Sequence, residues 1–490
     1  MDALETMDSL MLAGERFGSA MHVGVLLILT PPPDADLDGY VDRLYRDSLI
    51  VDQKVDPRLR RHPHRGTDTA GIWAWREVEE IDLREHVHRV TLTPGSGPSD
   101  LWELVSELHG GRLDMSVPLW TSYLIDGLPD GRFALYIKIH HTVIDGVGGL
   151  RMISESLSPD PDRRSLPPFY ADKGDTPADT AATKKTTKET GKAAKPEPAG
   201  DKRSRLPSPF AAVRAVADAA AAGLDLTRRV ATAELANLIG AMVTDSVVPP
   251  FDAPHTRFNA KLGPRRAAAG ISLDRERIRA VQEAAQVTAN DVVTAMIAGA
   301  LRAWLLERDQ LPERTMVAMC PVSVRDRDGM SEGQSNSGNK FGLGLCPLGT
   351  DIADPLERLA FIHLAMKNIK KQVATKGSDA MLAVMGPAIG STVVLPLLPF
   401  NTLLPPSCNM AISNVPGPRQ EMYYNGAHLD EIYPVSTVYD GMGLNVTVCN
   451  YAGQVGVGYV TAYDVMPRVG ELIPLTEQAL AELEAAAGVA

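Results

Sequence analysis

The organisation of this chain is decided by the stretch Arg132-Phe-Ala-Leu-Tyr-Ile-Lys-Ile-His-His-Thr-Val-Ile-Asp-Gly146, which continues as Val147-Gly-Gly149. Residues 133–139 are rich in β-branched and aromatic side chains, which predicts a strand. Side chains alternate between the two faces of a strand. One face should therefore carry Leu135, Ile137, Ile139 and His141, and the other Tyr136, Lys138 and His140. Only one histidine of the pair can face a given cleft.

The histidine pair leaves this strand four residues before an acid, Asp145, and a glycine break. The arrangement is typical of a general base, because neutral imidazole accepts a proton near pH 7 and an unperturbed imidazole titrates near pH 6.5. Three plainer interpretations compete with it: a metal site, histidines satisfied in the core, and simple turn chemistry at Asp145-Gly146. Neighbouring strand residues diverge and no third ligand has a recognisable spacing, which disfavours the metal site. Turn formation and service to the site are compatible for Asp145.

His140-His141-Thr-Val-Ile-Asp145-Gly146 matches the H-H-x-x-x-D-G signature of CoA-dependent acyltransferases and of peptide-synthetase condensation domains. The whole chain resembles one branch of that superfamily, the bacterial wax ester synthase/acyl-CoA:diacylglycerol acyltransferases. Each supporting motif is weak alone, but the ordered set is strong. It consists of Met21-His-Val-Gly24, Pro118-Leu-Trp120, Asn290-Asp-Val-Val293, Pro321-Val-Ser-Val-Arg325, Gly338-Asn339 and Ser413-Asn-Val-Pro-Gly-Pro418.

This resemblance implies an α/β (α+β) fold of two chloramphenicol-acetyltransferase-like halves, with the active-site tunnel between them. It implies that His141 is the general base and that His140 has a supporting role. Asp145 is then structural and paired with an arginine, for which the candidates are Arg58, Arg60 and Arg325, while Gly146 belongs to the turn. Asn290, Asp291, Ser413 and Asn414 become candidates for substrate binding, although Asn290 as a helix N-cap with Asp291 in the first turn is also a complete physical account of that pair.

The composition is that of a soluble globular protein, with 44% hydrophobic and 22% charged residues among 490. A net charge of −12 argues against broad nucleic-acid binding. The four cysteines lack C-x-x-C spacing and the acidic N-terminus lacks a signal-peptide n-region, so we expect reduced thiols and a cytoplasmic protein. No uninterrupted apolar run reaches the roughly 20 residues that span a bilayer.

The chain is expected to divide into three parts. Residues 1–158 form an N-terminal half with the histidine motif, residues 159–209 a flexible linker, and residues 210–490 a C-terminal half. The linker is rich in Lys, Ala, Thr, Glu and Pro, and cannot bury enough apolar surface to offset its chain entropy. Within the C-terminal half, residues 213–243 have a helical pattern, and residues 380–418 contain no charged side chain. That uncharged stretch is either ordinary core, a wall for an acyl chain or a membrane contact.

The resulting hypothesis is an O-acyltransferase that moves a long-chain acyl group from acyl-CoA to diacylglycerol, forming triacylglycerol. Acyl-CoA is a substrate, and neither a cofactor nor a metal is expected. The alternatives are a wax ester synthase that uses a fatty alcohol, an idle lipid-droplet-binding protein, and a condensation enzyme that uses carrier-bound thioesters. We expect peripheral association with the inner face of the membrane or with lipid droplets. No G-x-S-x-G elbow, P-loop or G-x-G-x-x-G motif supports other chemistry.

Overall fold

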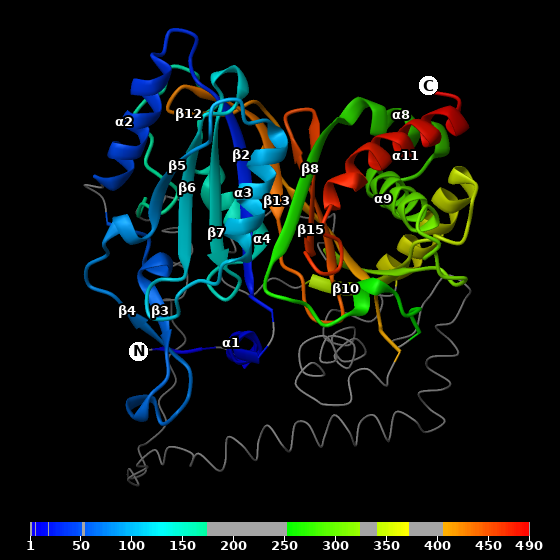
Figure 1. The fold of residues 1–490 in the computed structure, drawn as a ribbon, viewed down its shortest axis with the longest axis horizontal. Helices are drawn as coiled ribbons and strands as arrows, with labels where there is room; N and C mark the ends of the chain where they lie inside the picture. The colour runs from blue at the N-terminus through cyan, green and yellow to red at the C-terminus, as the bar shows by residue number, and fades with distance from the viewer. Residues whose placement is uncertain are drawn as a thin grey trace, which may run out of the picture.

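Two six-stranded sheets lie side by side in the structure (Figure 1). It is a computed structural model, and it describes residues 2–4, 6–17, 19–50, 54–173, 252–323, 341–371 and 405–489. The first sheet has the strand order β12 (Tyr423–Tyr424), β13 (Ala427–Val435), β2 (His22–Thr30), β7 (Phe133–His140), β6 (Trp120–Asp126) and β5 (Val87–Thr91). The motif strand is therefore β7, at the centre of this sheet, as its apolar sequence predicts.

The second sheet has the order β10 (Phe341–Pro347), β9 (Val317–Ser323), β11 (Met410–Pro416), β14 (Leu444–Tyr451), β15 (Gln454–Ala462) and β8 (Arg266–Asp274). Its strands β11 and β14 run parallel, and the predicted hairpin of β14 and β15 is present. Helices pack against the sheet on the side away from the first half: α8 (Arg275–Ala285), α9 (Ala289–Leu306), residues 355–371 and α11 (Leu472–Ala487). This confirms an α/β architecture of two halves.

Helix α9 is long and apolar enough to cross a membrane by length and composition, although Asp291 and Arg302 interrupt its 18 residues. However, 72% of its residues are buried inside the fold. Met296, Ile297 and Leu301 have no exposed surface and belong to the largest hydrophobic cluster of the C-terminal half. The apolar character of α9 is thus that of a core helix.

One strand of the first sheet comes from the C-terminal half of the chain. β13 pairs antiparallel with β2, from His428 opposite Thr30 to Val435 opposite Gly24. On its way it crosses β15 at Gly456 and Gly458. A Cβ atom at these two positions would lie only 2.0 and 1.9 Å from the carbonyl oxygens of Ile432 and Pro434. The crossing therefore requires glycine, and the sheets do not follow the predicted division at residues 158 and 210.

The two halves also share a hydrophobic cluster around α3 (Pro98–Gly110). Val105 on α3 belongs to it with Tyr136 of β7, Tyr433 of β13 and Val460 of β15. The remaining N-terminal elements are α1 (Thr6–Phe17), α2 (Leu37–Leu49), α4 (Gly146–Ser154) and a small sheet of β1 (Asp2–Ala3), β4 (Ala74–Glu77) and β3 (Arg61–His64).

The first part of the predicted linker packs on the N-terminal half. Phe169 and Tyr170 are buried, and the Tyr170 ring stacks on that of Trp120 with centroids 4.9 Å apart. Ordered structure therefore continues at least to residue 173, fifteen residues past the predicted boundary at 158. Residues 174–209 of the linker, the predicted helix at 213–243, and residues 380–404 of the uncharged stretch lie outside the described residues.

Candidate active site

A cavity of about 350 Å³ opens between the two sheets, and His141 is on its wall. The N-terminal half contributes the ends of β2 and β7 and one side of α4. The C-terminal half contributes β9, β11, β14 and the end of β13. The lining includes His141, Asp145, Gly146, Ser413, Asn414, Ser436 and Thr447, together with aliphatic side chains such as Val25, Ile137 and Ile139. The position between the halves agrees with the tunnel expected from the sequence.

The face prediction for the motif strand is confirmed. Ile137, Ile139 and His141 line the cavity, whereas Lys138 and His140 point to the opposite side of the sheet and bond to helices there. The backbone N–H of His141 donates to the carbonyl of Met21 at 2.8 Å, which extends the pairing of β7 with β2. Of the two histidines, only His141 can meet a substrate in this cavity.

Burial lowers the pKa of His141 below its ordinary value, while a bond to its own backbone carbonyl and the charge of Asp145 oppose the shift. An apolar surrounding disfavours the imidazolium form. The imidazole is therefore neutral at pH 7 and able to accept a proton. This corrects the expected titration near pH 6.5, since the ionisation moves to lower pH.

Asp145 is the N-cap of α4. Its Oδ1 accepts the N–H of Gly148 at 2.6 Å, and its carbonyl accepts that of Gly149 at 2.8 Å. The structural role is thus a helix cap. Gly146 is the first residue of α4. A Cβ atom at this position would lie 3.8 Å from Cγ1 of Val415 on β11.

The predicted arginine partner of Asp145 is not found within the part of the chain that the structure describes. Arg58 is held by Asp56, with Nη2 to Oδ2 at 2.7 Å. Arg60 bonds to the carbonyl of Val78 and approaches Glu77 at 3.3 Å. These two assignments are wrong because closer acceptors occupy both guanidinium groups. Arg325 lies outside the described residues.

His140 is bound from both sides and has no exposed surface. Its Nδ1 accepts the backbone N–H of Thr142 at 3.2 Å and contacts the Thr142 hydroxyl at 2.7 Å. Nε2 must therefore carry the proton, and it lies 2.7 Å from Oε2 of Glu15 on α1. The same oxygen accepts the N–H of Met21 at 3.1 Å. Glu15 thereby ties together the ends of β2 and β7 next to His141.

Three further polar side chains are buried on the same face as His140. His109 of α3 contacts the hydroxyl of Tyr136 through Nδ1 at 2.8 Å and the carbonyl of Ser436 through Nε2 at 2.9 Å. Lys138 donates to the carbonyl of Leu108 in the last turn of α3 at 2.7 Å and to that of Gly111, the residue after α3, at 2.9 Å. Burial lowers the pKa of His109 to about 3 and that of Lys138 to about 8.

The C-terminal wall of the cavity is made of hydroxyl and amide groups. Ser413 on β11 is directly opposite Thr447 on β14, and both line the cavity. The amide of Asn414 donates to Oδ1 of Asn290 at 2.6 Å and accepts from Asn450 at 3.2 Å. The structure thus brings Ser413 and Asn414 to the cavity, while Asn290 supports the wall from α9. Thr447 and Ser436 were not singled out from the sequence, because no local motif marks them.

Asp291 faces away from the cavity. It is 1% exposed and forms a reciprocal cap with Thr288, whose backbone N–H donates to Oδ2 at 2.9 Å. His363 also contacts Oδ2, at 2.7 Å. The N-cap of α9 is therefore Thr288, not Asn290. A capping role fits Asp291, and direct substrate binding does not.

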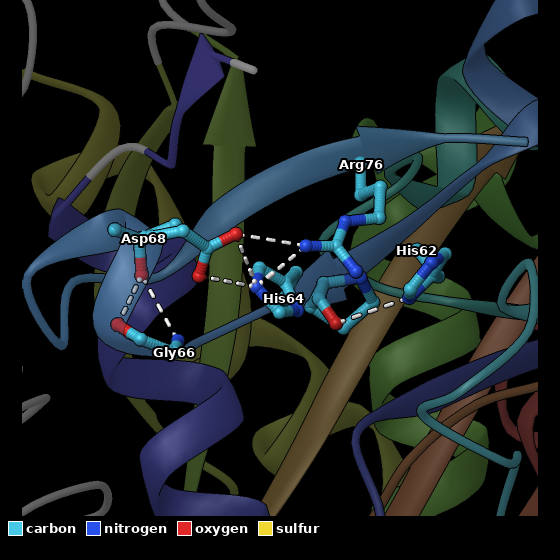
Figure 2. A network of polar contacts seen from close by, with 7 residues as sticks. His62, His64, Gly66, Asp68 and Arg76 are labelled. Carbon is cyan, nitrogen blue, oxygen red and sulfur yellow. Dashed lines mark hydrogen bonds and ion pairs between the residues drawn. The ribbon is translucent and has the colours of Figure 1, made fainter.

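His62 and His64 belong to a separate surface network (Figure 2). Asp68 is contacted by Nε2 of His64 at 2.8 Å and by the guanidinium of Arg76 at 2.9 Å. These groups come from β3 and β4 and the turn between them, away from β7 (Figures 1 and 2). No cluster of three metal-ligand side chains occurs among the described residues.

Comparison with known proteins identifies the family. The wax ester synthase/diacylglycerol acyltransferase catalytic domain matches residues 4–293, and the C-terminal domain of the same family matches residues 337–484. The chain belongs to the wax ester synthase/diacylglycerol acyltransferase family. A Mycobacterium tuberculosis protein named "probable diacylglycerol O-acyltransferase" is 35% identical, with both chains covered completely. A second one, also bearing a diacylglycerol O-acyltransferase name, is 37% identical over 98% of this chain and 90% of its own.

Solved structures agree with this assignment. The wax ester synthase/diacylglycerol acyltransferase from Marinobacter aquaeolei VT8 superposes with a TM-score of 0.76 at 30% identity, over 100% of both chains. The starter condensation domain of rhizomide synthetase, at 12% identity, covers 99% of this chain and 95% of its own with a TM-score of 0.51. The second likeness shows a common fold alone. The chain is thus an acyltransferase of this family with a condensation-domain-like fold.

Proposed function

We propose that this acyltransferase moves a long-chain acyl group from acyl-CoA to the free hydroxyl of a diacylglycerol, forming triacylglycerol. The observation that carries the proposal is the placement of His141, a neutral imidazole on the wall of a largely aliphatic cavity between the two sheets. Such a cavity suits lipid substrates. The names of the mycobacterial relatives support diacylglycerol as the acceptor.

In this mechanism the acceptor hydroxyl gives its proton to the His141 imidazole while its oxygen attacks the thioester carbonyl. A carbon–oxygen bond forms and the carbon–sulfur bond breaks. The imidazolium then returns the proton to the CoA thiolate, so that an ester and free CoA leave. General-base assistance of this kind contributes about 10² to 10⁴ in rate. Ser413 is placed on the opposite wall, where its hydroxyl can stabilise the developing oxyanion, whereas the Thr447 hydroxyl already donates to Oδ1 of Asn445 at 2.8 Å.

Both substrates carry chains that partition into lipid, so we also propose that the protein works at a membrane or lipid-droplet surface. The support is in the sequence, where residues 380–418 carry no charge. Flotation with liposomes that contain diacylglycerol tests this part. Recovery of the protein only in the lipid-free fraction would contradict it.

The activity is tested with labelled palmitoyl-CoA and, in separate detergent micelles, dioleoylglycerol or hexadecanol. We expect labelled triacylglycerol, and its loss in His141→Ala. Labelled wax ester alone would assign the fatty-alcohol alternative. Binding of both lipids without any product would assign the idle lipid-binding alternative.

A further inference from the structure

Next to the cavity at His141 lies a second cavity, of about 40 Å³. Ile137 of β7 and Ile153 of α4 line both. The lining of the second cavity is apolar apart from three serines and two tyrosines. The lining of the two cavities follows β7 from His141 to Leu135, and this stretch is called the path below.

The floor of this path is a row of leucines across three strands. Leu135 of β7 pairs with Leu27 of β2 on one side and with Leu124 of β6 on the other, and all three line the second cavity. Leu135 retains exposed surface, although Phe133 and Ile137 on the same face are 0% and 1% exposed. A central strand should be covered at this point, so the exposure of Leu135 marks a gap in the packing.

The path ends at charged groups. The second cavity shares Leu44 and Pro168 with an open hollow of about 900 Å³ beside α2. That hollow is lined by Arg43 and Arg164 and by three aspartates. A hydrocarbon gains nothing by entering such surroundings, so the apolar part of the path has a definite length.

We propose that the second cavity is the far end of the acyl site, and that the acyl chain of the thioester lies along β7 from His141 to Leu135. A strand advances about 3.3 Å per residue, so this distance is about 20 Å. Single carbon–carbon bonds of about 1.5 Å at tetrahedral angles advance about 1.25 Å each, so an extended chain of about 16 carbons fills it. The site therefore selects palmitoyl-class chains. This inference rests on the proposed acyl-CoA chemistry.

The roof of the path has to yield when the chain enters. A volume of 40 Å³ holds little more than one water molecule, at about 30 Å³ each. The roof consists of Ile153 and Leu157, on and just after α4, and the ordered segment that carries Phe169 and Tyr170. The floor belongs to a hydrogen-bonded sheet, so the adjustment falls on the roof side chains.

Leu135→Phe tests the path by blocking its far end. The substitution should lower kcat/KM for palmitoyl-CoA at least tenfold relative to octanoyl-CoA, because about four methylenes lose their burial and each is worth about a factor of four. An octanoyl chain spans only about 10 Å and so ends before Ile137, which is about 13 Å from His141. An unchanged palmitoyl-to-octanoyl ratio in this folded variant would overturn the proposal.

Leu27→Ala and Leu26→Ala form a matched pair that does not depend on the folding of the blocked variant. Both leucines are on β2 and are buried, at 1% and 0% exposure, but only Leu27 lines the path. Leu27→Ala should raise the preference for C20 over C16 acyl-CoA several-fold, and Leu26→Ala should leave it unchanged. Equal changes in both, or a shift in acceptor chain length alone, would overturn the proposal. Absence of transfer from any acyl-CoA by the unmodified protein would instead refute the proposed function.

Discussion

On one face of β7, His141 borders an open cavity with aliphatic neighbours, and within the described part of the chain it forms no ion pair. On the other face, Lys138 and His140 are enclosed by α3 and α1. Both faces carry imidazoles, but among the described residues only on the back face do others hydrogen-bond to both ring nitrogens, as in His109 and His140. One strand therefore serves catalysis on its front face, which carries His141, and stability on its back face, which carries Lys138 and His140. The front residue remains available for a substrate proton, while the back residues hold the strand in place through bonds that a substrate never reaches.

The largest effect is expected on the front face. His141→Ala should lower acyl transfer by about 10² to 10⁴ with little change in thermal stability, because the imidazole is the only base the cavity offers at that position among the described residues. Steady-state assays with palmitoyl-CoA and a melting curve measure the two quantities. Full activity in this variant, with loss in His140→Ala, would exchange the roles of the two faces.

Substitutions on the back face should lower the stability of the fold more than the activity. Glu15→Ala strands the Nε2–H of His140 and the N–H of Met21, at about 1–3 kcal/mol for each buried donor. Denaturant unfolding should show this loss. Glu15→Gln is the matched control, because one oxygen accepts both bonds and Oε1 has no partner among the described residues. The amide can replace Oε1, so most of the stability and activity should return. Equal damage from both substitutions would show that the charge matters, not the bonds.

The two faces should also titrate separately. The pKa of His109 is about 3 in the folded protein and about 6.5 when unfolded, so the unfolded state binds more protons between these values. Stability contributed by His109 therefore falls as the pH drops from 6.5 towards 3, by up to about 1.4 kcal/mol per unit. His109→Gln should flatten this dependence in urea unfolding. A difference in unfolding free energy between the wild type and His109→Gln that stays constant from pH 7 to 4 would contradict this prediction.

Activity should follow the front face instead. Activity requires neutral His141, so kcat/KM should rise with pH and reach its plateau at a lower pH than a free imidazole would allow. Measurements of kcat/KM between pH 4.5 and 8 should show the rise at the same pH in the wild type and in His109→Gln. If His109→Gln shifted the pH at which kcat/KM rises, the ionisation of His141 would be coupled to the residues of the back face.

The smallest effect is expected at Asp145, which both caps α4 and raises the pKa of His141. Asp145→Asn keeps an oxygen for the N–H of Gly148, so α4 should remain capped and activity at pH 8 should stay within about threefold. Loss of the charge should move the rise of kcat/KM to slightly lower pH, since Asp145 raises the pKa of His141. Asp145→Ala should cost about 1 kcal/mol of stability. A collapse of activity in the asparagine variant would assign the carboxylate a chemical role.

Strand periodicity predicted correctly which histidine of the pair faces the cavity, since alternation along β7 is a local property. It could not predict Glu15, which reaches His140 from 125 residues away with no motif to announce it. The arginine expected beside Asp145 failed for a similar reason: Asp56 and Glu77 lie nearer to the candidates. At α9 the error was smaller, because Thr288 and Asn290 are both good caps and only the backbone geometry distinguishes them.

The crossing of β13 over Gly456 and Gly458 has a consequence for biosynthesis. The Thr30 hydroxyl donates to Asp430, 400 residues later, at 2.6 Å, so β2 has no neighbour on that side until the C-terminal region leaves the ribosome. At about 5–20 residues per second this takes roughly 20–80 s. During that time an apolar strand edge is open to other chains. Fragments that end before β13 should therefore aggregate, and cells should need chaperones to bring the nascent chain to its finished state.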